Sequence, residues 1–168
     1  MHQILIPTKR AELLKDKKLF AEIRKRLGCR IEVRDENELL IDGDALSEYN
    51  ARIVMQAFAR GFEFETACKL LGDERFFESI DMKQLFKNEE QIKRIKARVI
   101  GAGGKTKIHV QNVSGADLAI YGDTVSMIGT VDEIKIARAA IEVLLKGGTH
   151  KNAYTIMERM KRRLKEGM

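Results

Sequence analysis

The sequence of 168 residues predicts an α+β protein made of two similar units in tandem, each with the element order β-α-α-β-β-α. The first observation is an internal repeat, because residues 43–61 align with residues 129–147 and Gly43 then lies opposite Gly129. The second is the helical spacing of apolar residues in both stretches. The third is the pair of short strand-like runs before each stretch. Such a unit forms a three-stranded sheet with helices on one face, and two packed together should be steadier than one.

The first half begins with a short apolar run and then changes to helical spacing. Gly28 is expected to end the second helix and Gly61 the last, since glycine is typical of a C-cap. Apolar residues at helical spacing also predict a helix over residues 62–71 that bridges the halves, and Gly72-Asp73 predicts a break after it. We expect a strand over 3–6, helices over 9–14 and 18–27, strands over 30–33 and 38–41, and a helix within 43–61.

The second half repeats this order. Gly122-Asp123 is a tight-hairpin signal between its last two strands. We expect a strand over 75–80, helices over 89–100 and 105–113, strands over 117–121 and 124–128, and a helix within 129–147. A C-terminal amphipathic helix over 151–165 follows, with Tyr154, Met157 and Met160 packed against the second unit and its basic end solvated (Lys161, Arg162, Arg163 and Lys165). The predicted domains are residues 1–71 and 72–168.

The composition suits a globular protein and permits a polyanionic partner. Hydrophobic residues make up 44% and charged residues 33%, and the net charge is +6. Tryptophan is absent and aromatic residues are only 6%, which argues against a recognition platform built mainly from stacked aromatics. Apolar runs are too short for a membrane span, and the N-terminus lacks the pattern of a signal peptide. Cys29 and Cys68 are too few and too far apart for a disulfide scaffold or zinc site, so we expect buried thiols in a cytoplasmic, monomeric protein without cofactor or metal.

A glycine-rich turn, residues 101–106, joins two predicted helices and is followed at once by Lys105. Glycines allow close backbone approach to a ligand, and a helix start with a nearby cation favours phosphate. A nucleotide-binding P-loop would need glycine at Val99 and a preceding strand. The GXXG clamp of a KH RNA-binding module joins two helices, as here. The third interpretation is a glycine-rich C-cap and turn without ligand.

The whole chain resembles a pair of type I KH domains in its element order. The most specific parts are residues 94–106, 121–129 and 147–154. They resemble archaeal members of the ribosome-assembly KH family that includes the eukaryotic "partner of Nob one" protein. The resemblance implies binding of single-stranded RNA at the 3′ region of small-subunit rRNA during pre-rRNA processing. It also implies assistance to the rRNA-maturing endonuclease and other assembly factors, and no catalytic activity of its own.

The first half departs from the KH pattern at the clamp. Residues 15–18 occupy that position and include no glycine. A Cβ atom at each residue blocks close approach of a sugar-phosphate chain, and Asp16 adds repulsion. We therefore expect the first module to serve mainly for packing or protein binding.

The expected RNA-binding residues lie in the second module. The clamp backbone from Gly101 through the small tip, Ala102 and Gly103, to Gly104 would approach phosphates, with Lys105 adding charge. Arg94 and Arg98, one turn apart, would line the backbone path. The apolar floor would come from Ile100, Ile108, Leu118 and Ile120, of which Ile108 and Ile120 are expected to be mostly buried.

Two other functions compete with RNA-directed assembly. A nucleotide hydrolase lacks both the P-loop glycine and an evident pair of catalytic carboxylates. A non-catalytic protein-interaction scaffold with weak, nonspecific RNA binding is the alternative that the divergent first clamp and the small tip of the second keep open.

Overall fold

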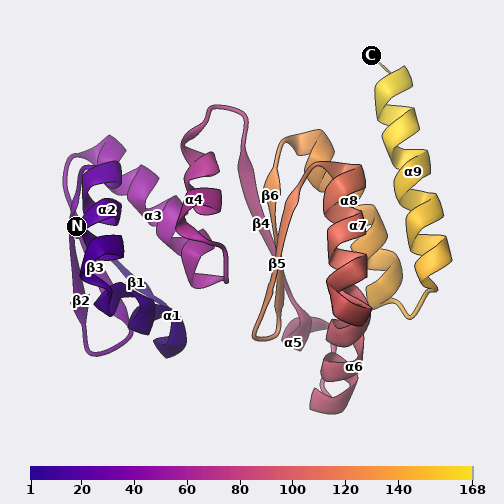
Figure 1. Cartoon of the computed structure of the whole chain (residues 1–168), viewed down its shortest axis with the longest axis horizontal. Helices are drawn as coiled ribbons and strands as arrows, with labels where there is room; N and C mark the ends of the chain where they lie inside the picture. The colour runs from indigo at the N-terminus through magenta and orange to yellow at the C-terminus, as the bar shows by residue number, and fades with distance from the viewer. Residues whose placement is uncertain (168) are drawn as a thin grey trace. The chain divides into compact units, whose positions relative to one another are not determined.

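The computed structural model describes residues 1–167 and divides into two compact units, Met1–Asp73 and a second that begins at Glu74. Each unit has one three-stranded antiparallel sheet, with the strand order β1-β3-β2 in the first and β4-β6-β5 in the second. The order β-α-α-β-β-α is present in both units (Figure 1). The predicted fold class, including the C-terminal helix, is confirmed.

The first unit carries its helices against a core built on the central strand. Leu39 and Ile41 alternate along that strand with their side chains fully buried, and Ile31 of the neighbouring strand pairs with Ile41. Its elements are β1 (His2–Leu5), α1 (Thr8–Glu12), the 3₁₀ helix η1 (Leu13–Lys15), α2 (Lys17–Leu27), β2 (Arg30–Arg34), β3 (Glu38–Asp42), α3 (Ala45–Ala59), α4 (Phe64–Ala67) and the 3₁₀ helix η2 (Cys68–Leu71).

The second unit has the same plan and one more long helix. Its elements are β4 (Phe76–Asp81), α5 (Met82–Leu85), α6 (Glu89–Ile100), the 3₁₀ helix η3 (Ala102–Gly104), α7 (Lys105–Ser114), β5 (Asp117–Tyr121), β6 (Thr124–Gly129), α8 (Val131–Leu145) and α9 (His150–Glu166). A two-residue turn joins β5 to β6, since Tyr121 pairs with Thr124, and Gly122 there has a φ of +55°. This confirms the predicted tight hairpin.

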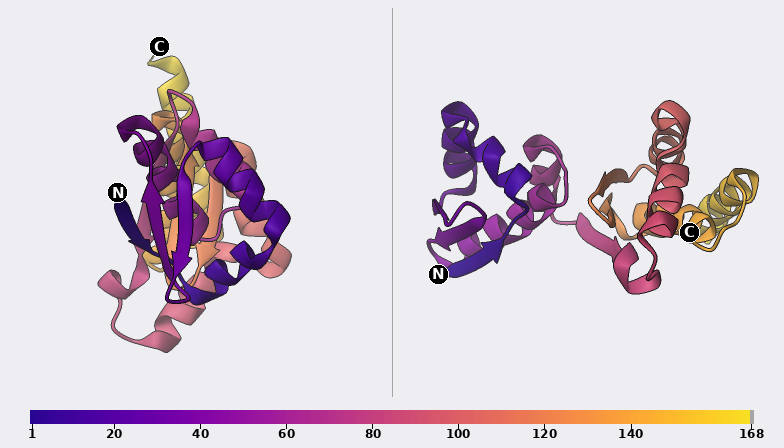
Figure 2. Two further views of the ribbon diagram at one scale, coloured as in Figure 1. Left: turned by 90° about the vertical axis from the view of Figure 1, so that its left-hand side faces the viewer. Right: turned by 90° about the horizontal axis from the view of Figure 1, so that it is seen from below.

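The core of the second unit lies between one sheet face and four helices. Val125 and Met127 of β6 are fully buried, and the cluster around them takes side chains from α6, α7, α8 and α9. Helix α8 packs on β6, and α9 packs on α8 and α7, with α9 outermost (Figure 2). Met157 is fully buried and Tyr154 and Met160 are partly buried against this core, so the predicted packing of α9 is confirmed.

Two details differ from the predicted elements. The segments predicted as single helices over 9–14 and 62–71 are each a short α-helix that continues as a 3₁₀ helix, α1 into η1 and α4 into η2. Helix α5 was not expected, because four residues are too few for a periodic pattern; its N-terminus is capped by the Asp81 side chain, which accepts from the Lys83 N–H.

No helix within residues 1–167 is long and apolar enough to cross a membrane.

Candidate nucleic-acid interface

The glycine-rich turn connects α6 to α7 and owes its shape to three glycines with positive φ. Gly101, Gly103 and Gly104 have φ values of +78°, +60° and +78°, a backbone region that other residues rarely adopt. The preceding element is a helix rather than a strand. The context that a P-loop requires is therefore missing in this part of the described chain.

The three glycines differ in the space around the position of an added Cβ atom. A Cβ atom at Gly101 would lie 2.3 Å from the Thr106 hydroxyl oxygen and 2.7 Å from the Thr106 backbone nitrogen. Nothing lies within 4 Å of a Cβ built at Gly103 or Gly104. Gly101 is thus required by the chain's own packing, whereas the space beside Gly103 and Gly104 is open to a ligand.

The start of α7 is left without a side-chain cap. Gly104 occupies the N-cap position and makes no side-chain hydrogen bond to the first turn. Lys105 is exposed beside it. An uncapped helix N-terminus carries free N–H groups and a partial positive charge, which together suit a phosphate.

Helix α9 supports the buried side of α7. The ring of Tyr154 in α9 packs at a tilt against that of His109, with ring centroids 4.2 Å apart, and its hydroxyl lies 3.4 Å from that of Thr106. The His109 ring is half-buried as a result. These contacts fix α7 behind the turn. Sequence reasoning missed them because a contact between α7 and α9 has no local signal.

Arg94 and Arg98 do not lie with the glycines. Arg98 donates a hydrogen bond to the carbonyl of Gly148, and its own carbonyl oxygen is 2.9 Å from the His150 Nε2 atom. Arg98 therefore holds the connection between α8 and α9, while Arg94 is exposed. Both arginines line a pocket between α5, α6 and α8 to which none of the described residues 101–105 contributes.

The predicted apolar floor needs correction. Leu118 is only 3% exposed and belongs to the core, because it pairs with the fully buried Met127 on the inner face of the sheet. Ile108 is 52% exposed, so the expectation that it is mostly buried is wrong. Ile100 and Ile120 are half-buried. Ile100 and Ile108, on the helices that flank the glycines, remain available to a ligand.

The first unit has a different structure at the matching position. There η1 leads into α2, and the carboxylate of Asp16 accepts hydrogen bonds from the N–H groups of Lys18 (2.9 Å) and Leu19 (3.3 Å). The α2 N-terminus is therefore already occupied by an anionic side chain, so the role of Asp16 is capping in addition to the expected repulsion.

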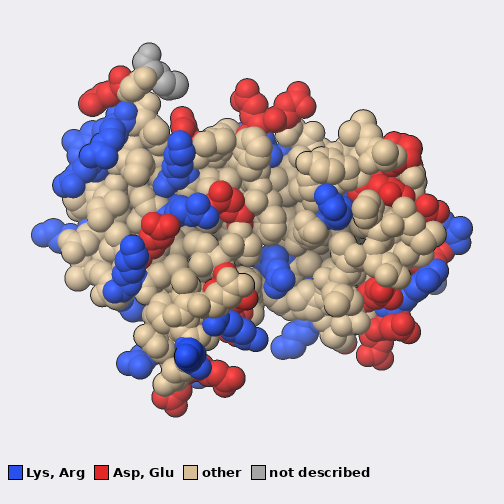
Figure 3. Space-filling view, turned by 180° about the vertical axis from the view of Figure 1, so that it is seen from behind, with Lys and Arg blue, Asp and Glu red and all other residues tan. Residues whose placement is uncertain are grey.

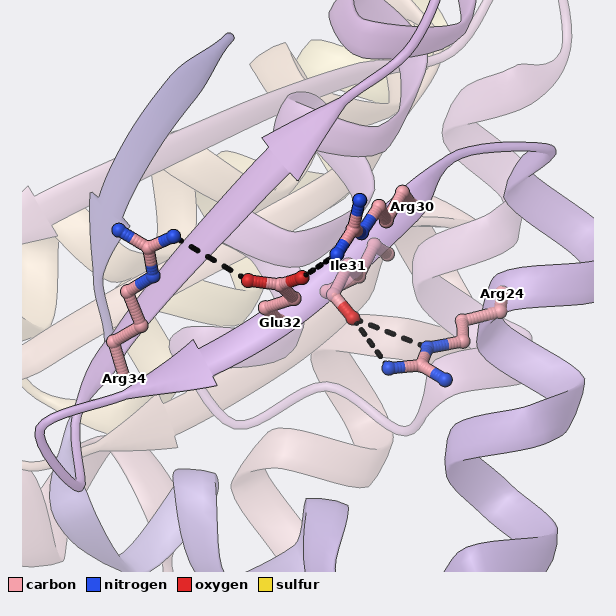
Figure 4. A network of polar contacts seen from close by, with 5 residues as sticks. All are labelled: Arg24, Arg30, Ile31, Glu32 and Arg34. Carbon is pink, nitrogen blue, oxygen red and sulfur yellow. Dashed lines mark hydrogen bonds and ion pairs between the residues drawn. The ribbon is translucent and has the colours of Figure 1, made fainter.

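Charged side chains along β2 of the first unit pair with one another. Glu32 lies 2.5 Å from Arg30 and 3.4 Å from Arg34, and Arg24 donates two hydrogen bonds to the Ile31 carbonyl (Figure 4). The Arg30 hydrogen bond and charge, followed by those of Arg34, lower the pKa of the Glu32 carboxyl. The arginines of this strand are thus partly neutralised within the unit.

Basic side chains also gather at the end of α9, at the upper left of the view from behind (Figure 3). They are exposed, as predicted: Lys161, Arg162, Arg163 and Lys165.

Comparison with known proteins identifies the family of the chain. Residues 76–162 match the model of the eukaryotic-type KH domain, KH-domain type I. A KH domain-containing protein of Methanocaldococcus jannaschii is 35% identical over 167 residues, covering 95% of this chain and 74% of that protein. The pre-rRNA-processing protein pno1 of Schizosaccharomyces pombe is 28% identical over 114 residues, which are 67% of this chain and 47% of that protein.

Solved structures extend the likeness to both units. The aDim2p protein of Pyrococcus horikoshii OT3, in a complex with a/eIF2alpha and rRNA, superposes with a TM-score of 0.86 at 33% identity. The superposition covers 96% of this chain and 94% of that one. The chain therefore belongs to the type I KH-domain family, in the branch that contains the PNO1 and Dim2 proteins.

Proposed function

We propose that the protein binds single-stranded RNA through the turn at residues 101–105 and acts, without catalysis, in ribosome assembly. The RNA is the 3′ region of the small-subunit rRNA, and the partners are the endonuclease that matures this end and other assembly factors. The free, buried thiols Cys29 and Cys68 fit the reducing cytoplasm, where we place this work.

The observation that carries the proposal is the open N-terminus of α7. A phosphate there would accept hydrogen bonds from the first-turn N–H groups, and Lys105 would add its charge. The absence of a Cβ at Gly103 and Gly104 lets the sugar-phosphate chain come close to the protein backbone. KH modules hold about four nucleotides in this way.

Base contacts would come from the helices beside the turn. Ile100 ends α6 and the exposed Ile108 lies in the first turns of α7. Both are aliphatic, so they would pack against base faces without reading base edges, and sequence preference would need polar groups in addition.

The relatives support the assembly role. The S. pombe relative is a pre-rRNA-processing protein, and the P. horikoshii neighbour was solved with rRNA. Neither name describes an enzyme.

The proposal is tested by placing a carboxylate where the phosphate would lie. Gly103→Asp fits the turn, since the added Cβ meets open space and aspartate tolerates positive φ better than most residues. Binding is measured by fluorescence anisotropy with a labelled RNA from the 3′ end of the organism's small-subunit rRNA, across a salt series. We expect a loss of at least about tenfold, or about 1.4 kcal/mol.

Gly28→Asp is the matched control. Gly28 also has positive φ (+66°), and its nearest neighbour to an added Cβ is the Ser47 hydroxyl at 3.9 Å. The control carries the same change of charge but lies in the first unit. Equal affinity of wild type and both variants, or equal losses in both, with a steep dependence on salt, would instead indicate nonspecific charge attraction and favour the scaffold function.

A further inference from the structure

The pocket that contains Arg94 and Arg98 is a second concave surface of the second unit. Its volume is about 740 Å³, within the range of roughly 300–1,000 Å³ usual for ligand sites. Its walls come from the end of β4 and from α5, α6 and α8, and we call it the α5–α6–α8 pocket. Its apolar lining is Ile80, Leu85, Phe86, Ile95 and Leu145.

The apolar lining is partly open to solvent. Leu85 of the short helix α5 is 55% exposed, and Ile80 and Phe86 are half-buried. Ile95 and Leu145 are buried and form the base. The apolar lining therefore continues from a buried base to a solvent-exposed side chain.

The rim of the pocket has an excess of positive charge. Arg94, Arg98, Arg138 and Lys146 line it, against one carboxylate, Glu142. Arg138 is neutralised by Glu78 at 2.5 Å and also lies 3.9 Å from Glu142. Arg94, Arg98 and Lys146 make no ion pair within residues 1–167, although Arg98 bonds the Gly148 carbonyl. Against these three cations the pocket lining offers one carboxylate, Glu142, so the rim keeps an excess of positive charge.

The chemistry of the lining favours a protein segment over RNA. Recognition of RNA bases uses stacking on aromatic rings and hydrogen bonds to base edges. Here Phe86 is the single aromatic ring among the described lining residues, and Gln91 is the single side-chain amide. Aliphatic side chains below and cations above instead match a segment whose apolar residues fill the pocket while its carboxylates meet the rim.

We propose that the α5–α6–α8 pocket docks an acidic protein segment that carries one or two large apolar side chains flanked by Asp or Glu. The residues that line this pocket are different from those of the glycine-rich turn. The second unit would therefore bind a partner protein and RNA with different side chains. Arg94 and Lys146 would attract the carboxylates, and Leu85 would cover the apolar side chain.

The test uses a phage-displayed library of random 12-residue peptides, selected on the full-length protein. Selection is repeated on the double variant Arg94→Glu/Lys146→Glu and on Leu85→Asp. The control is Lys93→Glu/Lys135→Glu, which makes the same change of charge at exposed residues of α6 and α8 outside the pocket. Far-UV circular dichroism and thermal melting show that each variant is folded.

We expect wild type and control to enrich peptides with acidic residues around Leu, Ile or Phe, and the pocket variants not to enrich them. The best peptide, synthesised with a fluorescent label, should bind the double variant at least about tenfold more weakly than wild type. RNA binding, measured in parallel, should respond to Gly103→Asp and not to Leu85→Asp.

Three results would overturn the proposal: no peptide enriched on wild type, enrichment that survives in both pocket variants, or enrichment of basic peptides. If instead the pocket variants lost RNA binding and enriched no peptide, the pocket would belong to the RNA path. The failure of Gly103→Asp to weaken RNA binding would affect only the function proposed for the turn.

Discussion

Helices α2 and α7 occupy the same place in the two units but present opposite chemistry at their N-termini. Each follows a 3₁₀ helix, η1 or η3. In α2 the Asp16 carboxylate accepts hydrogen bonds from N–H groups of the first turn. In α7 the N-cap residue is Gly104, which leaves the first-turn N–H groups without a side-chain partner. A carboxylate in the first case stands where a phosphate would bind in the second. The same topology therefore caps its own helix in the first unit and leaves a helix N-terminus open in the second.

The largest effect is expected from closing the space at Gly101. Gly101→Ala brings a Cβ against the Thr106 backbone and imposes a positive φ on alanine. The free energy of unfolding should fall by about 3 kcal/mol, measured by urea denaturation, and RNA binding should fall with it.

Gly103→Ala provides the contrast within the same turn, since its Cβ meets open space. Its cost should be only about 1 kcal/mol, the strain of a positive φ alone. Equal costs at the two glycines would show that packing on Thr106 does not set the shape of the turn.

A smaller effect is expected from removing the cap of α2. Asp16→Ala frees the N–H groups of Lys18 and Leu19 and should lower stability by about 1 kcal/mol. RNA affinity should stay unchanged, because the neighbouring backbone of η1 has no glycine to let RNA approach. A clear gain in RNA affinity would mean that Asp16 alone keeps the first unit from binding.

The smallest effect on stability at neutral pH is expected from a substitution of Glu48 in α3. Glu48 of α3 lies at the position that the repeat assigns to the buried Ile134 of α8. A hydrogen bond from the Met1 amino group (2.8 Å), then one from the Gly43 N–H (3.0 Å), lowers the pKa of the Glu48 carboxyl below its usual 4.5.

Because the pKa of Glu48 is lower in the folded state, the ionised carboxylate stabilises the protein at pH values above the pKa that it has in the unfolded chain. This stability is lost as the pH falls through the lowered pKa of the folded state. Glu48→Gln should therefore have a lower free energy of unfolding than wild type near pH 7, and this free energy should fall less steeply as the pH is lowered. Urea unfolding at several pH values measures both. Parallel acid profiles would show that Glu48 contributes no linkage.

Local patterns were enough to predict most of the fold. The helix expected over 89–100 is found at those residues, with Asn88 as its cap, and the Gly28 C-cap and the two-residue hairpin are where glycine signals placed them. Aspartate before a helix is a start signal, so the sequence also carries the information for the capping role of Asp16.

The site was harder to predict, because its composition depends on which face of each strand or helix is buried in the core. Alternation shows that Leu118 and Ile120 share a face without showing that this face is the inner one. Arg94 and Arg98 were correctly placed on one side of a helix, but the side faces α8, whose Arg138 and Leu145 are distant in sequence. Tertiary packing decides both questions.

The contact between Gly101 and Thr106 changes how the family's sequences should be compared. A glycine needed for the turn itself will persist in descendants that have stopped binding RNA. Invariance at Gly101 therefore indicates that the fold is kept and does not indicate RNA binding. A Cβ atom at Gly103 or Gly104 would meet open space, so selection can hold glycine there only through a ligand or through the turn's φ angles. Lineages that keep the first glycine and replace the last are therefore the ones in which loss of RNA recognition should be sought.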